Sequence, residues 1–282
     1  MQTIIGLGQA GCNLADKFNQ HPEYKIYKID VGLKDKGCFN LSLQNTPEEY
    51  EEKCPVLKIR AFLKSIEGEV LFITSCGNVS GASLRILEQL KNNCEISVLY
   101  IKPDVSFLSE IKTLQDNLIF NVLQEYARSA VFEKIYLVDN ENLSDIVGDV
   151  PIREYYNHLN SLVVSTFHMI NIFNHSEPVL NNYSKIVDTA RILTLGLIDY
   201  KNDEEKIFFN LGALREKRYY YALPEEKIET DKKLMKDIRK QLKNKIKHDK
   251  MNVSYGIYQT NYEQEYVYCI SYSSTVQNML DN

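Results

Sequence analysis

The first half of the chain alternates between short apolar runs and segments in which apolar residues recur at helical spacing. The apolar runs lie at residues 2–7, 25–31, 69–74, 96–101 and 134–138. Helical patterns lie between them at residues 13–20, 47–66, 83–92 and 107–128. Strands that alternate with helices of this length pair in parallel, because each helix carries the chain back across the sheet. The pattern therefore predicts a doubly wound α/β domain with a parallel sheet.

The loops of such a domain have a predictable place. In open parallel sheets, ligands bind beyond the carboxyl ends of the strands, and these ends lie at one edge. We therefore expect function at the loops that follow the predicted strands, residues 6–13, 30–34, 75–81, 102–104 and 139–142.

The second half follows a different pattern. Residues 152–173 carry apolar side chains on nearly every face of a helix, which is typical of a buried helix. Strand-like runs at 192–199, 206–211, 253–259 and 266–273 then surround one long basic helix at 231–247. A length of 282 residues suits two domains. We predict a parallel-sheet domain at 1–150, a central connecting helix at 151–175 and a smaller α+β domain at 176–282.

Composition excludes several classes of protein. With 44% hydrophobic and 25% charged residues, the chain can bury a full core. A net charge of -5 argues against a general nucleic-acid binder, because phosphates require a cationic surface. No apolar run approaches the roughly 20 residues of a membrane span, and the first residues lack a secretory signal, so we expect a soluble cytoplasmic protein. The scattered cysteines include no Cys-x-x-Cys pair, which favours reduced thiols over a structural zinc site.

The segment GLGQAGCN at residues 6–13 joins the first predicted strand to the first predicted helix. Closely spaced glycines let the backbone approach a phosphate, and the next helix supplies amide groups and a partial positive charge. Gly6, Gly8 and Gly11 also satisfy the Rossmann pattern Gly-x-Gly-x-x-Gly, and Asp30 would serve as its ribose carboxylate. A nicotinamide- or flavin-dependent oxidoreductase and a tight turn without a ligand are thus both open at this point.

Four segments in order carry a resemblance to a known family. Residues 8–18, GQAGCNLADKF, resemble the opening of tubulin and, more loosely, of FtsZ. Residues 75–81, SCGNVSG, partly match the second phosphate loop of that superfamily, with several glycines replaced. Residues 136–146, YLVDNENLSDI, resemble the tubulin strand and helix start that supply a guanine-binding asparagine. Residues 156–163, YNHLNSLV, resemble the start of tubulin's central helix. A Rossmann oxidoreductase leaves the last three matches unexplained.

The resemblance implies a site for GTP or GDP with Mg²⁺. It implies that the phosphates lie against two segments, Gly8, Gln9, Ala10, Gly11 and Cys12 and then Gly77, Asn78, Val79, Ser80 and Gly81. Gln9 would also reach a water on Mg²⁺, and Asp30 would lie near the sugar and phosphates. The ribose ligand is open between Asn117 and Glu110.

The resemblance also implies how the base is held. Tyr156 would stack on the guanine, and Asn140 and Asn160 would bond its edge. Tyr156 and Asn160 are one helical turn apart and so share a face. An asparagine amide offers both a donor and an acceptor, which suits the guanine edge. As isolated residues, these three would be ordinary cap and surface positions.

The resemblance weakens after the central helix. Tubulin and FtsZ carry an Asn-x-Asp-x-x-acid loop there, which enters the neighbouring subunit's nucleotide site and polarises the attacking water. Aligned on Leu180 and Asn181, the two acidic positions hold Tyr183 and Ile186. Glu177 and Asp188 are the remaining catalytic candidates, and both also suit a solvated loop.

The overall expectation is a small prokaryotic, plasmid or phage-type relative of tubulin and FtsZ. Such a protein would polymerise head to tail and act as a GTPase at the subunit interface. The alternative is a nucleotide-binding regulatory or structural relative that has lost polymer-coupled hydrolysis. The basic segment 232–250 suits a solvated helix face, or docking of an adaptor or an acidic partner. We expect no membrane contact and no direct sequence-specific binding of nucleic acid.

Overall fold

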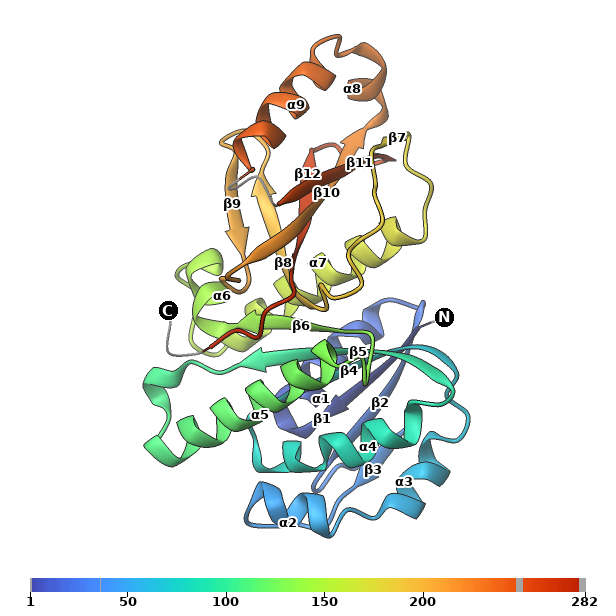
Figure 1. Ribbon diagram of the computed structural model, residues 1–282, viewed down its shortest axis with the longest axis vertical. Helices are drawn as coiled ribbons and strands as arrows, with labels where there is room; N and C mark the ends of the chain where they lie inside the picture. Colours follow the sequence, from blue (N-terminus) through green and yellow to red (C-terminus); the bar gives the residue numbers. More distant parts are fainter. Residues whose placement is uncertain (1, 36, 247–250, 279–282) are drawn as a thin grey trace. The chain divides into compact units, whose positions relative to one another are not determined.

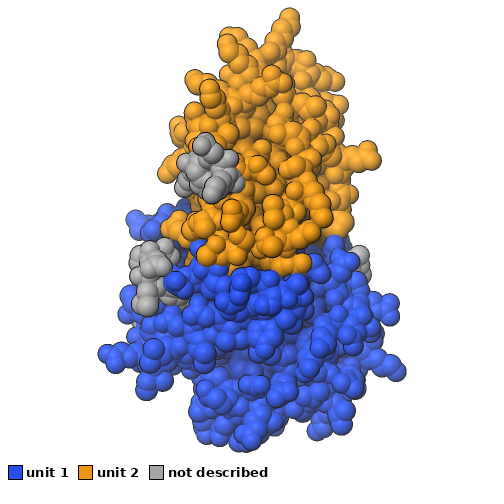
Figure 2. All heavy atoms as spheres, viewed as in Figure 1, with its two compact units in different colours: residues 1–164, 276–282 blue, residues 165–275 orange. Residues whose placement is uncertain are grey.

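The computed structural model describes residues 2–35, 37–246 and 251–278. The chain divides into two compact units (Figure 2). Unit 1 comprises residues 1–164 with 276–282, and unit 2 comprises residues 165–275. The division falls within the helix α7 (Tyr155–Asn174), and the domain boundaries expected at residues 150 and 175 stay a prediction.

The strands of unit 1 form a parallel sheet in the order β3-β2-β1-β4-β5-β6 (Figure 1). They are β1 (Gln2–Leu7), β2 (Tyr24–Asp30), β3 (Cys38–Asn40), β4 (Gly68–Ser75), β5 (Cys94–Lys102) and β6 (Lys134–Asp139). This confirms the predicted parallel α/β architecture. The strand order reverses direction between β1 and β4, where Gly6 pairs with Ile73. At such a switch point the two loops diverge and leave a crevice at the carboxyl edge.

The helices of unit 1 connect these strands. They are α1 (Gly8–Lys17), α2 (Pro47–Glu52), α3 (Val56–Leu63), α4 (Ser83–Leu90), α5 (Glu110–Arg128), α6 (Asn140–Val147) and the first half of α7. Short 3₁₀ turns are η1 (Phe18–Gln20), η2 (Asn78–Ala82) and η3 (Val105–Phe107).

The helix predictions at 13–20 and 47–66 were wrong in their bounds. The first helix begins at Gly8 rather than residue 13, because Gly8 makes the turn out of β1 with a φ of 71°. The helix predicted at 47–66 is two helices, since Pro55 lacks the amide needed to continue α2 into α3. The start of α2 is fixed by Thr46, whose side chain accepts a hydrogen bond from the Glu49 amide.

Unit 2 contains a mixed sheet in the order β9-β8-β12-β10-β11-β7. Its strands are β7 (Leu180–Asn181), β8 (Ile192–Asp199), β9 (Glu204–Ile207), β10 (Leu214–Pro224), β11 (Asn252–Thr260) and β12 (Tyr266–Ser273). Only β10 and β11 pair in parallel among the described strands of this unit. The helices α8 (Glu225–Thr230) and α9 (Leu234–Asn244) lie between them in sequence.

The core of unit 2 lies between its sheet and α9. Leu234, Ile238 and Leu242 line one face of α9 and pack with Tyr219 and Tyr221 of β10. The helix predicted at 231–247 is shorter at both ends in the structure, where α9 runs from Leu234 to Asn244. Residues 247–250 of the basic segment lie outside the described residues.

In the described part of the chain, no helix is both long and apolar enough to span a membrane.

Candidate functional site

The two glycine-containing segments lie next to each other at the carboxyl edge of the unit 1 sheet. The first opens α1 directly after β1, and the second forms η2 after β4. Strands β1 and β4 are hydrogen-bonded neighbours. A Cβ atom built on Gly8 would lie 3.7 Å from the Cβ of Val79. The structure thus brings together two segments that are about 70 residues apart in the chain, as the placement at the switch point requires.

The starts of both segments offer backbone amide groups at the sheet edge. Within the described residues, no side chain caps the start of α1 or of η2, and the first turn of α1 has no acidic residue. Gln9, Ala10 and Gly77 are exposed there. The first amides of a helix have no intrahelical acceptor and carry a partial positive charge. This arrangement suits an anion such as a phosphate group.

Several side chains of these segments are bonded within the protein. The Cys12 thiol is buried and donates to the Gly6 carbonyl oxygen at 3.4 Å, and burial raises the pKa of Cys12 to about 12. The Ser80 hydroxyl donates to the Gly77 carbonyl oxygen at 2.5 Å. These side chains shape the segments, so the surface left for a ligand is largely backbone.

Asn78 is held from two sides. Its Nδ2 donates to the Asn45 carbonyl oxygen at 2.6 Å, and its Oδ1 accepts from Gln115 Nε2 at 3.2 Å. The same Gln115 nitrogen lies 2.9 Å from the Cys76 carbonyl oxygen. The second segment is therefore fastened to α5 and to the loop before α2.

The glycines of the site are required for different reasons. A Cβ on Gly11 would lie 2.4 Å from the Ile73 carbonyl oxygen, and one on Gly81 would lie 1.9 Å from that of Pro47. Packing alone explains these two glycines. A Cβ on Gly77 would meet no atom of the described chain within 4 Å, so Gly77 faces open space.

The candidates for the sugar side lie on separate elements. Asp30 ends β2, and its carboxylate accepts a hydrogen bond from the Val31 amide at 2.8 Å, as a strand-end cap does. Burial raises the pKa of Asp30. Asn117 is half-buried on α5, with no hydrogen-bond partner for its Oδ1 within the described chain. Glu110 is the exposed first residue of α5.

The candidates for base recognition lie on two helices. Asn140 is the first residue of α6 and directly follows β6, so it lies at the same sheet edge as the glycine segments. Tyr156 is 65% exposed near the start of α7, and Asn160 is half-buried one turn later. An exposed tyrosine ring can act as a stacking platform, since the ring is already in contact with solvent.

The catalytic candidates lie in unit 2. Glu177 is exposed in the segment after α7. Asp188 is exposed and pairs with Lys185 at 3.2 Å. The role of both in catalysis stays a prediction.

Two residues near the site were missed from sequence. Gln115 carried no signal, because a glutamine in a helix is ordinary. Lys102 carried only a weak signal in the sequence, namely a charged residue directly after an apolar run. In the structure its ammonium lies 2.7 Å from a carboxylate oxygen of Asp139, with both side chains more than nine-tenths buried.

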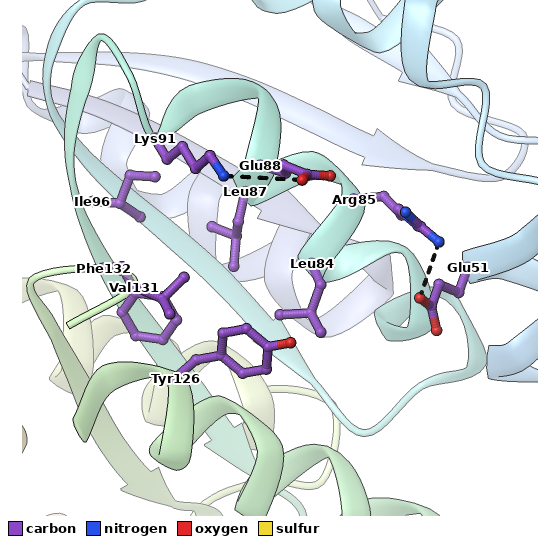
Figure 3. A pocket seen from close by; sticks show the side chains of 10 residues that line it. All are labelled: Glu51, Leu84, Arg85, Leu87, Glu88, Lys91, Ile96, Tyr126, Val131 and Phe132. Atoms are coloured by element: carbon purple, nitrogen blue, oxygen red, sulfur yellow. Dashed lines mark ion pairs between the residues drawn. The ribbon is translucent and has the colours of Figure 1, made fainter. Parts of the chain in front are cut away.

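A cavity of about 230 Å³ lies between α4 and α5, away from these residues (Figure 3). Its lining includes Leu84, Leu87 and Tyr126, with the Arg85–Glu51 ion pair at the rim. Ile96, near the amino end of β5, also lines it. The cavity is therefore not part of the carboxyl edge, and none of the predicted site residues lines it.

Comparison with known proteins gives a match only at the level of structure. No protein-family model matches the sequence, and no curated protein matches it significantly.

Three solved structures illustrate the structural match. Bacillus thuringiensis serovar israelensis TubZ, in GDP-form protofilaments, has a TM-score of 0.74 and 15% identity over 98% of this chain and 88% of its own. FtsZ from M. jannaschii has a TM-score of 0.69 and 12% identity over 96% and 87%. CetZ2 from Haloferax volcanii, a GTPγS-bound protofilament, has a TM-score of 0.68 and 11% identity over 99% and 94%. With the strand order and the two glycine segments described above, these matches show that the chain has the tubulin/FtsZ-like fold.

Proposed function

We propose that this protein binds GTP or GDP with Mg²⁺ at the carboxyl edge of the unit 1 sheet. The observation that carries the proposal is the pair of uncapped amide segments at the switch point between β1 and β4. Facing amide groups bind a polyphosphate with few basic side chains. Gln9 is exposed at the first of them and would contact a water on Mg²⁺, an ion that keeps several of its waters when bound to phosphates.

Recognition of guanine rests on three side chains in this proposal. Asn140 and Asn160 each supply an amide donor and acceptor for the base edge, and Tyr156 supplies a stacking face. Asn117 or Glu110 would bond the ribose. The nucleotide forms named for TubZ and CetZ2 support this assignment.

We further propose that the protein assembles with copies of itself, head to tail, as a cytoplasmic cytoskeletal protein. The support is the fold shared with TubZ and CetZ2, which are described as protofilaments, over nearly the whole chain. If the polymer acts as a GTPase, the acid for water attack would come from Glu177 or Asp188 of the next copy.

A second candidate is a nucleotide-binding relative that assembles without hydrolysing GTP. One observation favours it. Tyr183 occupies the position aligned with the family acid, and the guanidinium of Arg218 lies 4.5 Å from the centroid of its ring. The loop around it pairs with β11 through β7, and its Asn182 amide donates to the Tyr255 carbonyl oxygen at 3.1 Å. A loop held in this way has no acid to offer at that position.

A partner surface on α9 belongs to the same proposal. Lys236, Arg239, Lys240 and Lys243 are exposed on the side of α9 opposite its buried apolar face. Of the basic segment 232–250, residues 247–250 are not described. The exposed face would dock an acidic surface, on an adaptor or on a neighbouring copy. Charge reversal at Lys236 and Lys240 should then abolish a salt-sensitive association.

The test begins with the nucleotide that copurifies with the protein, released by heat and identified by chromatography. Guanine nucleotide supports the proposal, and a protein that binds neither GTP nor GDP on titration contradicts it. Sedimentation with GTP then tests assembly, which should begin above a critical concentration.

Phosphate release measured across protein concentrations separates the two candidates. A polymer-coupled GTPase turns over more than linearly with concentration, and Glu177→Gln or Asp188→Asn abolishes turnover. Exposed Glu67→Gln in unit 1 is the matched control. Assembly without phosphate release supports the second candidate.

A further inference from the structure

A buried ion pair joins the last residues of β5 and β6. Lys102 and Asp139 are register partners on these parallel strands. The Lys102 Nζ lies 2.7 Å from Asp139 Oδ2, and the two side chains are 9% and 8% exposed. Burying two charges is costly, so such a pair is retained only with good geometry and satisfied neighbours.

The other oxygen of Asp139 has a separate partner. Asp139 Oδ1 accepts a hydrogen bond from the Glu141 amide at 3.0 Å. Asp139 is thus the N-cap of α6, with extended backbone angles of φ -110° and ψ 122°. Each oxygen therefore fixes one end of a link that runs from Lys102 through the carboxylate to the first turn of α6.

Asn140 lies inside this link. It is the first residue of α6, between the cap residue and the residue whose amide the cap binds. When Lys102 holds the Asp139 carboxylate in place, the backbone of Asn140 is fixed as well. A neutral cap such as serine or asparagine would start the helix equally well. The lysine is therefore not needed for capping as such.

A third charged group makes the cation more important. Asp116 on α5 is fully buried, and burial raises its pKa to about 6, while Lys102 lowers that pKa and Asp139 raises it. The Lys102 ammonium thus interacts electrostatically with two carboxylates, those of Asp116 and Asp139. Without Lys102, Asp139 would face Asp116 uncompensated, and the carboxylate that caps α6 would lose its fixed orientation.

We propose that Lys102 is a positioning residue for base recognition: it holds Asp139, and through the cap of α6 it places the Asn140 amide against the guanine edge. This inference rests on the proposed guanine site. It assigns specificity to a residue that would not itself touch the nucleotide.

The test is a double-mutant cycle on Lys102→Met and Asp139→Asn, with affinities for GDP and ADP measured for each variant. Wild type should prefer GDP. Lys102→Met should reduce that preference about tenfold or more, because a freed carboxylate lets Asn140 move. The double variant, with an asparagine cap and no buried charge, should recover the preference to within about threefold.

Lys102→Arg keeps the cation and serves as the conservative control, so its preference for GDP should be retained. A purely structural role for Lys102 would lower the melting temperature while GDP and ADP affinities change by the same factor. That outcome would overturn the inference. A Lys102→Met protein that keeps the wild-type preference for GDP over ADP would also overturn it. Loss of the proposed site itself is distinguishable, since wild type would then show no preference for GDP.

Asp139→Ser gives a second result if Lys102→Met does not fold. Serine still caps α6, but it leaves the buried Lys102 ammonium without a carboxylate partner, and movement of this unpaired charge toward solvent would disturb the first turn of α6. The preference for GDP should fall in this variant as well. A full preference in Asp139→Ser contradicts the proposed link.

Discussion

The hydroxyl group of Tyr183 lies 3.0 Å from that of Tyr258 on β11. Gly256 makes room for this contact, because a Cβ there would lie 2.3 Å from the Tyr183 hydroxyl oxygen. Burial raises the pKa of Tyr183 well above its ordinary value. The side chain aligned with an acid in tubulin and FtsZ is therefore a neutral group built into unit 2.

An acid at position 183 should not create a GTPase. Tyr183→Asp would lose the contact with Tyr258 and place a carboxylate in a half-buried position, so we expect a lower melting temperature and no gain in phosphate release. Tyr183→Phe is the matched control and should cost about 1 kcal/mol of unfolding free energy. A rise in turnover in Tyr183→Asp would show that the position can still reach a nucleotide.

Guanine preference should depend on the two asparagines together. Asn140→Ala combined with Asn160→Ala removes the donors and acceptors proposed for the base edge, so GDP affinity should fall more than ADP affinity. Competition binding with both nucleotides measures this. Exposed Asn92→Ala after α4 is the control, and its preference should equal that of wild type. Unchanged discrimination in the double variant contradicts the assignment.

Two glycines of the second segment should respond in opposite ways. Gly77→Ala meets no protein atom and suits the local φ of -62°, so the melting temperature should be unchanged while nucleotide affinity falls. Gly81→Ala collides with the Pro47 backbone, and such overpacking costs about 1–3 kcal/mol or more of stability. Thermal melts and nucleotide titrations of both variants separate packing from ligand contact. Full affinity in Gly77→Ala would remove this segment from the site.

Asp116 should make stability depend on pH. Its pKa rises from 3.8 unfolded to about 6 folded, mainly through burial, while Tyr100 donates a hydrogen bond to it. The folded state therefore holds an extra proton between these values, and stability falls as pH rises through them. Asp116→Asn removes the ionisation but keeps an acceptor for Tyr100.

Denaturant unfolding of wild type and Asp116→Asn at several pH values checks this. Relative to wild type, the variant should gain about 3 kcal/mol between pH 3.8 and pH 7, with most of the change complete near pH 6. A stability difference that stays constant with pH would rule out a raised pKa at Asp116.

Strands made of apolar runs were predictable from sequence. Those at residues 2–7, 192–199 and 266–273 have the predicted bounds, since their burial is a local property of the sequence. The central strand β10 was missed, because its first half is charged. In the structure, Lys217 pairs with Glu205 at 2.5 Å, and Arg218 with Glu216 at 3.4 Å. The pair of Lys217 with Glu205 joins β10 to β9, so it cannot be recognised before these two strands are brought near each other.

The candidate site also has features that were predictable from the sequence and features that were not. The glycine segments were predictable, because each is a contiguous pattern after a strand. The tie from Gln115 to Asn78 and the pair of Lys102 with Asp139 were not, since each depends on which segments become neighbours. Cys12 was expected to lie against the phosphates, and in the structure its thiol donates to the carbonyl oxygen of Gly6.

Unit 1 includes residues from both sides of unit 2 in the chain. The buried side chain of Gln124 on α5 accepts from the Gln277 amide at 2.8 Å and donates to the Gln277 carbonyl oxygen at 3.1 Å. During synthesis, residue 277 emerges from the ribosome only after all of unit 2. Until then, the Oε1 atom of Gln124 lacks this partner, while its Nε2 atom also donates to the Phe120 carbonyl oxygen at 3.4 Å within unit 1. Most of unit 1 is therefore synthesised before unit 2, but its internal contacts are complete only after unit 2 has been synthesised.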